Sequence, residues 1–162
     1  MKKKILIIII TVLVIAGLGI IWQLKNKGSV KVSGENIGNE LEKQDLIRLT
    51  NPQPNDIIKS PLVITGEARG NWFFEGQFPV ELRIPSKPPQ AVVAKGIARA
   101  QSEWTTNEFV PFEATLTFEN PTGGFDEVLN PEHSLILELK KDNPSGLSQN
   151  DNSLDITVIL KK

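Results

Sequence analysis

Residues 112–119 read FEATLTFE, and this stretch decides the fold class of the chain. Its apolar residues alternate strictly with polar ones and would share one side of an extended strand: Phe112, Ala114, Leu116 and Phe118. Successive side chains of a β-strand point to opposite faces, whereas an amphipathic helix needs a period near 3.6. The stretch is therefore predicted to be a half-buried strand with one apolar face and one solvent-exposed face.

The same alternation recurs on both sides of this stretch. Residues 80–84 and 154–160 alternate in the same way, and all eleven prolines lie between Pro52 and Pro144. No part of this region has apolar residues at helical spacing over three turns. Further apolar runs, each bounded by Pro, Gly, Asn or Asp, lie at 47–49, 62–68, 92–100 and 135–140. We therefore expect an all-β domain of about seven short strands.

The number and spacing of these strands favour one architecture. Short strands separated by turn-rich segments over residues 46–162 predict an immunoglobulin-like two-sheet sandwich, whose inner faces form the core. A closed barrel is the alternative. The chain contains neither Cys nor Tyr, so it lacks the disulfide and the tyrosine corner of antibody domains. The likeness to immunoglobulins is therefore one of architecture.

Residues 5–24, ILIIIITVLVIAGLGIIWQL, contain no charged side chain. At about 1.5 Å rise per residue, a helix of this length spans roughly 30 Å, the thickness of a membrane's hydrocarbon core. A cleaved signal peptide is the alternative, but the apolar run continues beyond the small residues Gly17 and Gly19 to Trp22. We predict that residues 1–24 form a transmembrane signal-anchor. A four-residue tail followed directly by an apolar run is the arrangement of a signal-anchor, so we expect the N-terminus inside and the rest of the chain outside the cytoplasm.

Residues 25–45, KNKGSVKVSGENIGNELEKQD, are rich in Gly, Asn, Ser and charge. They contain too few apolar residues to form a core, so they are predicted to be a flexible linker, with a short helix possible at 40–44. The chain thus divides into an anchor at 1–24, this linker, and a sandwich domain at 46–162. The predicted location is the cell membrane, with a single pass and an extracytoplasmic domain.

Composition excludes several classes of function. The chain has no Cys, which excludes thiolate metal sites and a Cys nucleophile, and its single histidine, His133, cannot form a histidine pair for a metal. Residues 46–162 carry eleven basic and fifteen acidic residues, a net charge of −4, without a basic stripe for phosphate contacts. We therefore predict no metal, no cofactor, no nucleic-acid partner and no enzymatic activity.

Residues 47–76 read IRLTNPQPNDIIKSPLVITGEARGNWFFEG and resemble the opening of the bacterial spore-germination immunoglobulin-like domain family. The similarity consists of an apolar strand, a Pro-containing turn, a Ser-Pro pair at 60–61, an apolar-x-Gly-x-Ala strand at 64–68 and an aromatic-Glu step at 74–75. The later stretches FEATLTFENP and DNSLDITVIL are similar to later strands of that family. The resemblance implies an association with germination or sporulation and a binding or assembly role, and it implies no catalytic residue and no particular ligand.

Two aromatic segments are candidates for the contact surface. In NWFFE at 71–75, consecutive residues on a strand would point to opposite faces, so at least one ring should face outward beside Glu75. Trp104, in the loop QSEWTTNEF, is a second candidate. The alternative is that these rings complete the core at the edge of the sandwich. The predicted binding residues are Trp72, Phe73, Glu75 and Trp104, with Trp72 chosen as the outward ring.

Residues 142–155, DNPSGLSQNDNSLD, are rich in side-chain oxygen atoms. They lack the acidic spacing and the final Glu of a calcium-binding EF-hand loop, and are interpreted as a hairpin connection. Together these observations predict a membrane-anchored module that binds an envelope protein or glycan or serves in assembly. A carbohydrate-binding module, marked by coplanar exposed aromatic rings, is one alternative. A hydrolase, marked by a pocket with converging carboxylates, is the other.

Overall fold

The structure is a computed structural model that describes residues 38–85, 92–119 and 133–160. Within these ranges it contains eight β-strands, one short α-helix and two 3-10 turns. The elements, in chain order, are α2 (Glu40–Lys43), β1 (Ile47–Asn51), β2 (Ile57–Ile58), β3 (Leu62–Arg69), η1 (Gly70–Trp72), β4 (Gln77–Arg83), β5 (Val92–Ala100), β6 (Phe109–Leu116), β7 (Ser134–Lys140), η2 (Ser148–Asn150) and β8 (Ser153–Leu160).

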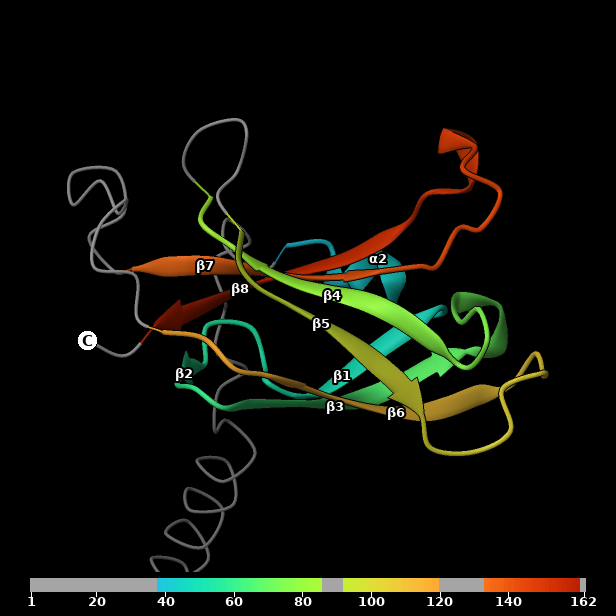
Figure 1. The fold of residues 1–162 in the computed structure, drawn as a ribbon, viewed down its shortest axis with the longest axis horizontal. Coiled ribbons are helices and arrows are strands. Elements are labelled where there is room, and N and C mark those ends of the chain that lie inside the picture. Colours follow the sequence, from blue (N-terminus) through green and yellow to red (C-terminus); the bar gives the residue numbers. More distant parts are fainter. Residues whose placement is uncertain (1–37, 86–91, 120–132, 161–162) are drawn as a thin grey trace, which may run out of the picture. The chain divides into compact units, whose positions relative to one another are not determined.

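All eight strands belong to one hydrogen-bonded sheet in the order β1-β3-β6-β5-β4-β7-β8-β2. The sheet folds over at β5, which pairs with β4 along nearly its whole length but joins β6 only at Arg99 and Ala100. Figure 1 shows the result: β4, β7 and β8 form one layer, β1, β3 and β6 form the other, and β5 runs diagonally between them. The domain is therefore a β-sandwich with its two layers joined through β5, and no ladder within the described residues closes β1 onto β2.

The alternation of apolar and polar residues along the strands places the hydrophobic core between the two layers. In β6 the burial alternates as the sequence predicts, with Phe112 2 % and Leu116 0 % exposed while Thr115 is exposed. In β8 the same alternation buries one side chain in two, from Leu154 to Leu160. The inward residues of both layers form a single apolar cluster, in which the rings of Phe78 and Phe112 meet edge to face, 5.0 Å apart.

Gly66 lies where β1 and β6 approach β3 from its two sides. A Cβ atom at this position would lie 2.2 Å from the carbonyl oxygen of Arg48 and 2.8 Å from the Phe112 ring. The sequence predicts that a glycine inside a strand permits a bulge or close backbone approach, and the β1–β3 register shifts beside it, between Leu49 and Asn51. The close approach of β1 and β6 to β3 at this point therefore depends on the missing side chain.

The predicted all-β, immunoglobulin-like fold is confirmed, with two refinements. Each of the seven predicted strands is present, and the structure adds an eighth, β2, which consists of two residues and pairs in parallel with the end of β8. A two-residue strand shows no alternation, so its sequence gives no signal. The two expected sheets are also one continuous sheet, because β5 shares hydrogen bonds with both layers.

The N-terminal predictions fall mainly outside the described residues. The predicted anchor, Ile5–Leu24, and most of the linker at 25–45 belong to the part of the chain that the structure does not describe. No helix within the described ranges is long and apolar enough to cross a membrane. The last linker residues do belong to the ordered domain: α2 follows Asn39, which hydrogen-bonds to β8. The domain thus begins by residue 38, earlier than the predicted boundary at 46.

Candidate functional site

A shallow cleft of about 330 Å³ lies at one end of the sandwich, between the β3–β4 connection and the β5–β6 loop. One wall is η1 and the residue after it, and the other wall is the loop that contains Trp104. Their apolar surface comes from two aromatic rings, and their polar surface comes from amides and hydroxyls. The lining residues, which we call the Trp104 cleft, are Gly70, Asn71, Phe73, Trp104, Thr105, Thr106 and Asn107.

Hydrogen bonds within the β5–β6 loop hold this wall in place. The Glu103 carboxylate accepts from the backbone N–H of Thr105 at 3.0 Å and from its hydroxyl at 2.6 Å, and these bonds lower the pKa of Glu103. The Thr106 hydroxyl accepts from the N–H of Glu108 at 3.1 Å. Such local side-chain bonds are the usual means by which Ser, Thr and acidic residues fix a turn. The loop is therefore shaped before any ligand arrives.

Trp104 also packs against the tight turn that directly follows the η1 wall in the chain. Phe74 and Gln77 exchange two backbone hydrogen bonds, of 3.0 and 3.1 Å, around Glu75 and Gly76. Both central residues have positive φ, 51° and 71°, as a type I′ hairpin turn requires. A Cβ atom at Gly76 would lie 3.2 Å from Cδ1 of Trp104, so the absent side chain leaves room for the indole.

The structure separates the four predicted binding residues. Trp72 is 1 % exposed and Phe73 is 5 % exposed, so the prediction that Trp72 faces outward is wrong and both rings belong to the core. The physical reason is that the chain leaves β3 and forms η1, which contains Trp72, so the alternation of a strand does not apply there. Glu75 is exposed at the turn, and Trp104 is half-buried with its edge packed on the core. Of the predicted set, Glu75 and Trp104 remain accessible.

The exposed ring of the aromatic cluster is Phe74, which was not among the predicted binding residues. Its side chain is 41 % exposed and it begins the turn that ends at Gln77. The sequence signal that identifies it is the Glu75-Gly76 pair, since a residue followed by Gly before an alternating strand is typical of a two-residue hairpin. If Glu75 and Gly76 are taken as the central residues of the turn, Phe74 is its first residue, and its side chain is expected at the surface.

The outer face of the β4–β7 layer carries a cluster of ion pairs. Nη2 of Arg83 lies 2.6 Å from a carboxylate oxygen of Glu81 and 2.6 Å from one of Glu138, and Lys140 lies 3.1 and 3.7 Å from the same two oxygens. Lys95 also approaches Glu81, at 3.3 Å. These pairs join three adjacent strands, because Glu81 is in register with Glu138 on β7 and with Lys95 on β5.

The two carboxylates of this cluster titrate in opposite directions. Burial raises the pKa of Glu81, but hydrogen bonds from Arg83, Lys140 and Lys95 outweigh it and lower the pKa to about 2. Burial raises the pKa of Glu138, more than Lys140 and Arg83 lower it. Converging carboxylates are the sign that would favour a hydrolase. Here the cations lie against both groups, an arrangement typical of a structural ion-pair network.

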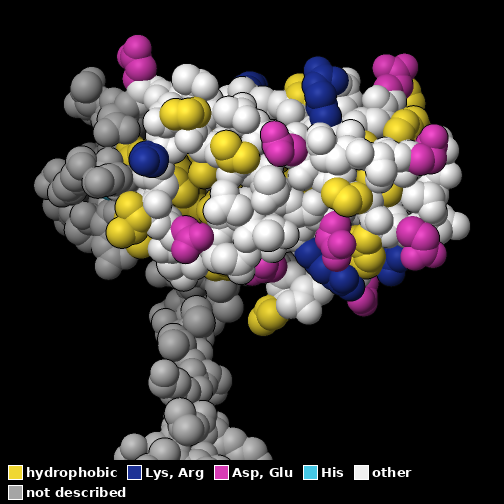
Figure 2. Space-filling model, turned by 90° about the horizontal axis from the view of Figure 1, so that it is seen from below, with side chains coloured by type: hydrophobic (Ala, Val, Ile, Leu, Met, Phe, Trp, Pro, Cys, Tyr) yellow, Lys and Arg dark blue, Asp and Glu magenta, His cyan; other side chains and the backbone are white. Residues whose placement is uncertain are grey.

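The outer face of the other layer is mixed in character. Figure 2 shows hydrophobic, basic and acidic side chains interspersed over it. One local grouping is ordered: the guanidinium groups of Arg48 and Arg69 lie 4.0 and 4.1 Å from the centroid of the Phe109 ring. Arg48 also pairs with Glu67 at 3.0 Å, and Arg69 donates to the carbonyl oxygen of Asn107. Arg69 therefore links this face to the loop that carries Trp104.

The fold and the cleft together define an all-β, immunoglobulin-like domain in which the accessible aromatic side chains of Phe74 and Trp104 lie on connections between strands at one end. Residues 46–130 match the immunoglobulin-like domain of bacterial spore germination. The chain belongs to this family, as its opening stretch predicts. The match covers β1 to β6, while β7 and β8, which complete one layer, follow it in the chain. Neither the comparison with curated proteins nor the comparison with solved structures finds a match.

Proposed function

We propose that the protein is a non-enzymatic, membrane-anchored binding module of the bacterial cell envelope, and that it contacts its partner through the Trp104 cleft. The observation that carries this proposal is the half-buried indole of Trp104 in a cleft whose two walls are ordered by their own hydrogen bonds. Family membership adds an association with germination.

The chemistry of the cleft supports contact rather than reaction. Trp and Phe rings combine a large apolar surface with little loss of side-chain entropy, and binding energy concentrates on such residues when neighbouring groups exclude water. Asn71, Asn107 and Thr105 surround the indole with donors and acceptors that can orient a polar partner. Preformed walls lower the ordering cost of binding.

A carbohydrate-binding module is the alternative form of this function. It is favoured by the mixture of an aromatic ring with amides and hydroxyls, which could serve a sugar's apolar face and its hydroxyl groups. Its mark would be a pair of coplanar exposed rings. The ring pairs in close contact among the described residues, Phe73–Phe78 and Phe78–Phe112, are tilted and lie in the core. We therefore favour an envelope protein as the partner, with a glycan as the alternative.

Site-specific photo-crosslinking in living cells tests this proposal. A photoreactive residue replaces Thr105 at the rim of the cleft in one full-length variant and Thr115 on the exposed face of β6 in another. Both sites are exposed threonines, so they provide matched positions. We expect a discrete crosslinked product from position 105 alone. Mass spectrometry of this product would show whether the attached partner is a protein or a glycan. No product from position 105, or equal products from both positions, would contradict the use of this cleft.

A further inference from the structure

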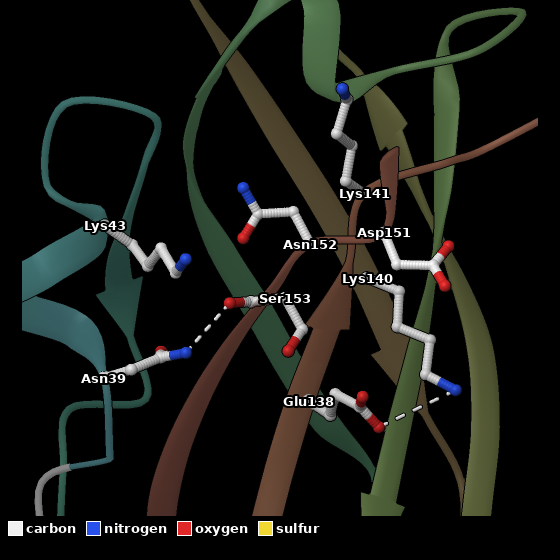
Figure 3. A pocket seen from close by; sticks show the side chains of 8 residues that line it. All are labelled: Asn39, Lys43, Glu138, Lys140, Lys141, Asp151, Asn152 and Ser153. Atoms are coloured by element: carbon white, nitrogen blue, oxygen red, sulfur yellow. Dashed lines mark hydrogen bonds and ion pairs between the residues drawn. The ribbon is translucent and has the colours of Figure 1, made fainter. Parts of the chain in front are cut away.

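A second, larger cavity lies between α2 and the β7–β8 hairpin, away from the residues of the Trp104 cleft. It encloses about 530 Å³. Figure 3 shows its lining: Lys43 extends from α2, and Asn152 extends toward it from the hairpin, with Ser153 and Glu138 behind them on the sheet. None of the eight side chains drawn there is aliphatic or aromatic, so the cavity is suited to a polar ligand rather than to an apolar side chain.

The wall formed by α2 is held firmly on the sheet. The Asn39 side chain donates to the carbonyl oxygen of Ser153 at 3.0 Å and accepts from the N–H of Asp155 at 2.9 Å, and the Asn39 N–H donates to the Asp155 carbonyl oxygen at 3.1 Å. Because three hydrogen bonds fix the residue directly before α2, the position of Lys43 relative to β8 is set before a ligand binds.

The charges around the cavity do not balance. The lining holds three lysines but only two carboxylates, Glu138 and Asp151. Lys140 pairs with Glu138 within the ion-pair cluster on the outer face of the sheet, and the Asp151 carboxylate accepts a hydrogen bond from the uncharged Asn143 amide at 2.7 Å. Lys43 and Lys141 are both half-buried, yet no carboxylate among the described residues lies within 4.0 Å of either ammonium group. The lining therefore carries an excess of positive charge, which a bound anion would balance.

We propose that this cavity binds an anionic group, a phosphate or a carboxylate, carried by a hydroxyl-bearing ligand. Lys43 supplies the counter-charge from the α2 wall and Lys141 supplies a second one from the hairpin. The Asn152 amide and the Ser153 hydroxyl have no hydrogen bond of their own within the described residues, so they are free to bond the anion or an adjacent hydroxyl. A volume of about 530 Å³ accommodates a group larger than a single phosphate ion.

This site does not depend on the Trp104 cleft, because the two share no lining residue. It adds to the proposed contact surface a polar pocket that selects by charge. A single anionic sugar unit combines the required charge with hydroxyl groups, whereas inorganic phosphate supplies the charge alone. The two probes therefore separate recognition of the anion from recognition of what carries it.

The test is a titration of the full-length, isotope-labelled protein in detergent micelles, followed by the backbone amide signals of Lys43, Asn152 and Ser153. Inorganic phosphate, D-glucuronate and uncharged D-glucose are added separately at constant ionic strength. We expect saturable shifts with phosphate, with glucuronate or with both, and none with glucose. A response to phosphate alone assigns the anion as phosphate. Absence of saturation with both anions, or an equal response to glucose, overturns the proposal.

Charge-removing variants locate the site. Lys43→Gln and Lys141→Gln lie on opposite walls, and each is expected to weaken anion binding about tenfold, as loss of a charge-assisted hydrogen bond does. Lys59→Gln is the matched control, because it removes the same charge from an exposed position elsewhere. An equal weakening by Lys59→Gln, or no weakening by either cavity variant, overturns the proposal. Crosslinking from position 105 should be unchanged in all three variants, so the outcome is independent of the proposed partner contact.

Discussion

Asn39 and Asp155 exchange two hydrogen bonds, one from the Asn39 backbone to the Asp155 carbonyl oxygen and one from the Asp155 backbone to the Asn39 side chain. This pair covers the first part of the outer edge of β8. Further along the same edge, the N–H of Asn55 donates to the Thr157 carbonyl oxygen at 2.7 Å, and β2 pairs with Ile159. The outer edge of β8 is thus covered along its length by two segments, Asn39 and residues 55–58, which protects it from pairing with another chain.

The cap at Asn39 is expected to contribute to stability. Asn39→Ala removes the bonds to Ser153 and Asp155 and leaves their backbone groups unsatisfied, at a cost of about 1 to 3 kcal/mol. Urea unfolding of the full chain measures the change. Glu42→Ala, an exposed position on α2, is the control and should lie within about 0.5 kcal/mol of the wild type. Equal stability of Asn39→Ala and the wild type would show that α2 is not part of the folded unit.

The core prediction concerns the two faces of β6. Phe112→Ala is expected to lower the free energy of unfolding by about 3 to 5 kcal/mol, because it removes a buried ring and leaves a cavity beside Phe78. Thr115→Ser, on the exposed face of the same strand, is expected to change it by less than about 0.5 kcal/mol. Denaturant melts of both variants measure the difference, and similar losses would contradict the inward and outward assignment of this strand.

The strands were predictable because their patterning is local. Alternation in 112–118 and 154–160 specifies both the strand and its buried face without any knowledge of partners. The short strand β2 and the cap at Asn39 could not be predicted in this way, because each is defined by a neighbour distant in sequence, β8. The continuity of the sheet through β5 likewise depends on hydrogen bonds that the end of β5 makes to β6, and the residues of β5 alone do not specify that partner.

The candidate sites were less predictable than the fold. The indole of Trp104 was identified from its loop, but Trp72 was misplaced because it lies in a 3-10 turn, where the alternation of a strand does not apply. The cavity at Lys43 lies against a segment whose composition is typical of a linker. It exists because one residue, Asn39, attaches that segment to the sheet. A site formed between two segments depends on how those segments are placed against each other in the fold, and the pattern of one sequence does not specify that placement.

Acid titration should reveal the ion-pair cluster around Glu81. Its pKa in the folded protein, about 2, is below the ordinary value of 4.5, so its stabilisation is present above pH 4.5 and is lost as the pH falls toward 2. We expect Glu81→Gln to be less stable than the wild type at pH 7, with the difference shrinking as the pH falls from 4.5 to 2. Urea melts across this range measure it, with the exposed Glu113→Gln as control.

A constant difference between Glu81→Gln and the wild type at every pH would show that the carboxylate contributes through packing rather than charge. The same result in Glu113→Gln as in Glu81→Gln would assign the acid sensitivity to the net charge of the protein. Either outcome would remove the ion-pair cluster from the account of stability.

The proposed anchor is tested by fractionation. The uncharged stretch 5–24 is expected to hold the full chain in the membrane fraction through washes with high salt and at alkaline pH, because such washes remove proteins bound by charge but not a helix in the bilayer. A variant without residues 5–24 is the control and should move to the supernatant. Release of the full chain at alkaline pH would contradict a spanning anchor.

The contact between Trp104 and Gly76 leads to a prediction that separates backbone strain from the packing of the cleft. Gly76 and Gly146 have nearly the same backbone conformation, with φ of 71° and 64°, but a Cβ atom would lie 3.2 Å from the Trp104 ring at Gly76 and would contact nothing within 4 Å at Gly146. A left-handed conformation costs a residue with a side chain about 1 to 2 kcal/mol. Gly146→Ala should therefore lose about that amount, and Gly76→Ala should lose at least as much.

Only Gly76→Ala should also displace the indole. Its tryptophan fluorescence should shift in wavelength relative to the wild type, and crosslinking from position 105 should fall, because the methyl group pushes the ring from the wall that shapes the cleft. Gly146→Ala should leave both measurements unchanged while matching the loss in urea stability. Unchanged fluorescence in Gly76→Ala would contradict the packing of Trp104 against this turn. A shift in fluorescence with unchanged crosslinking would show that the indole is not the residue that positions the partner.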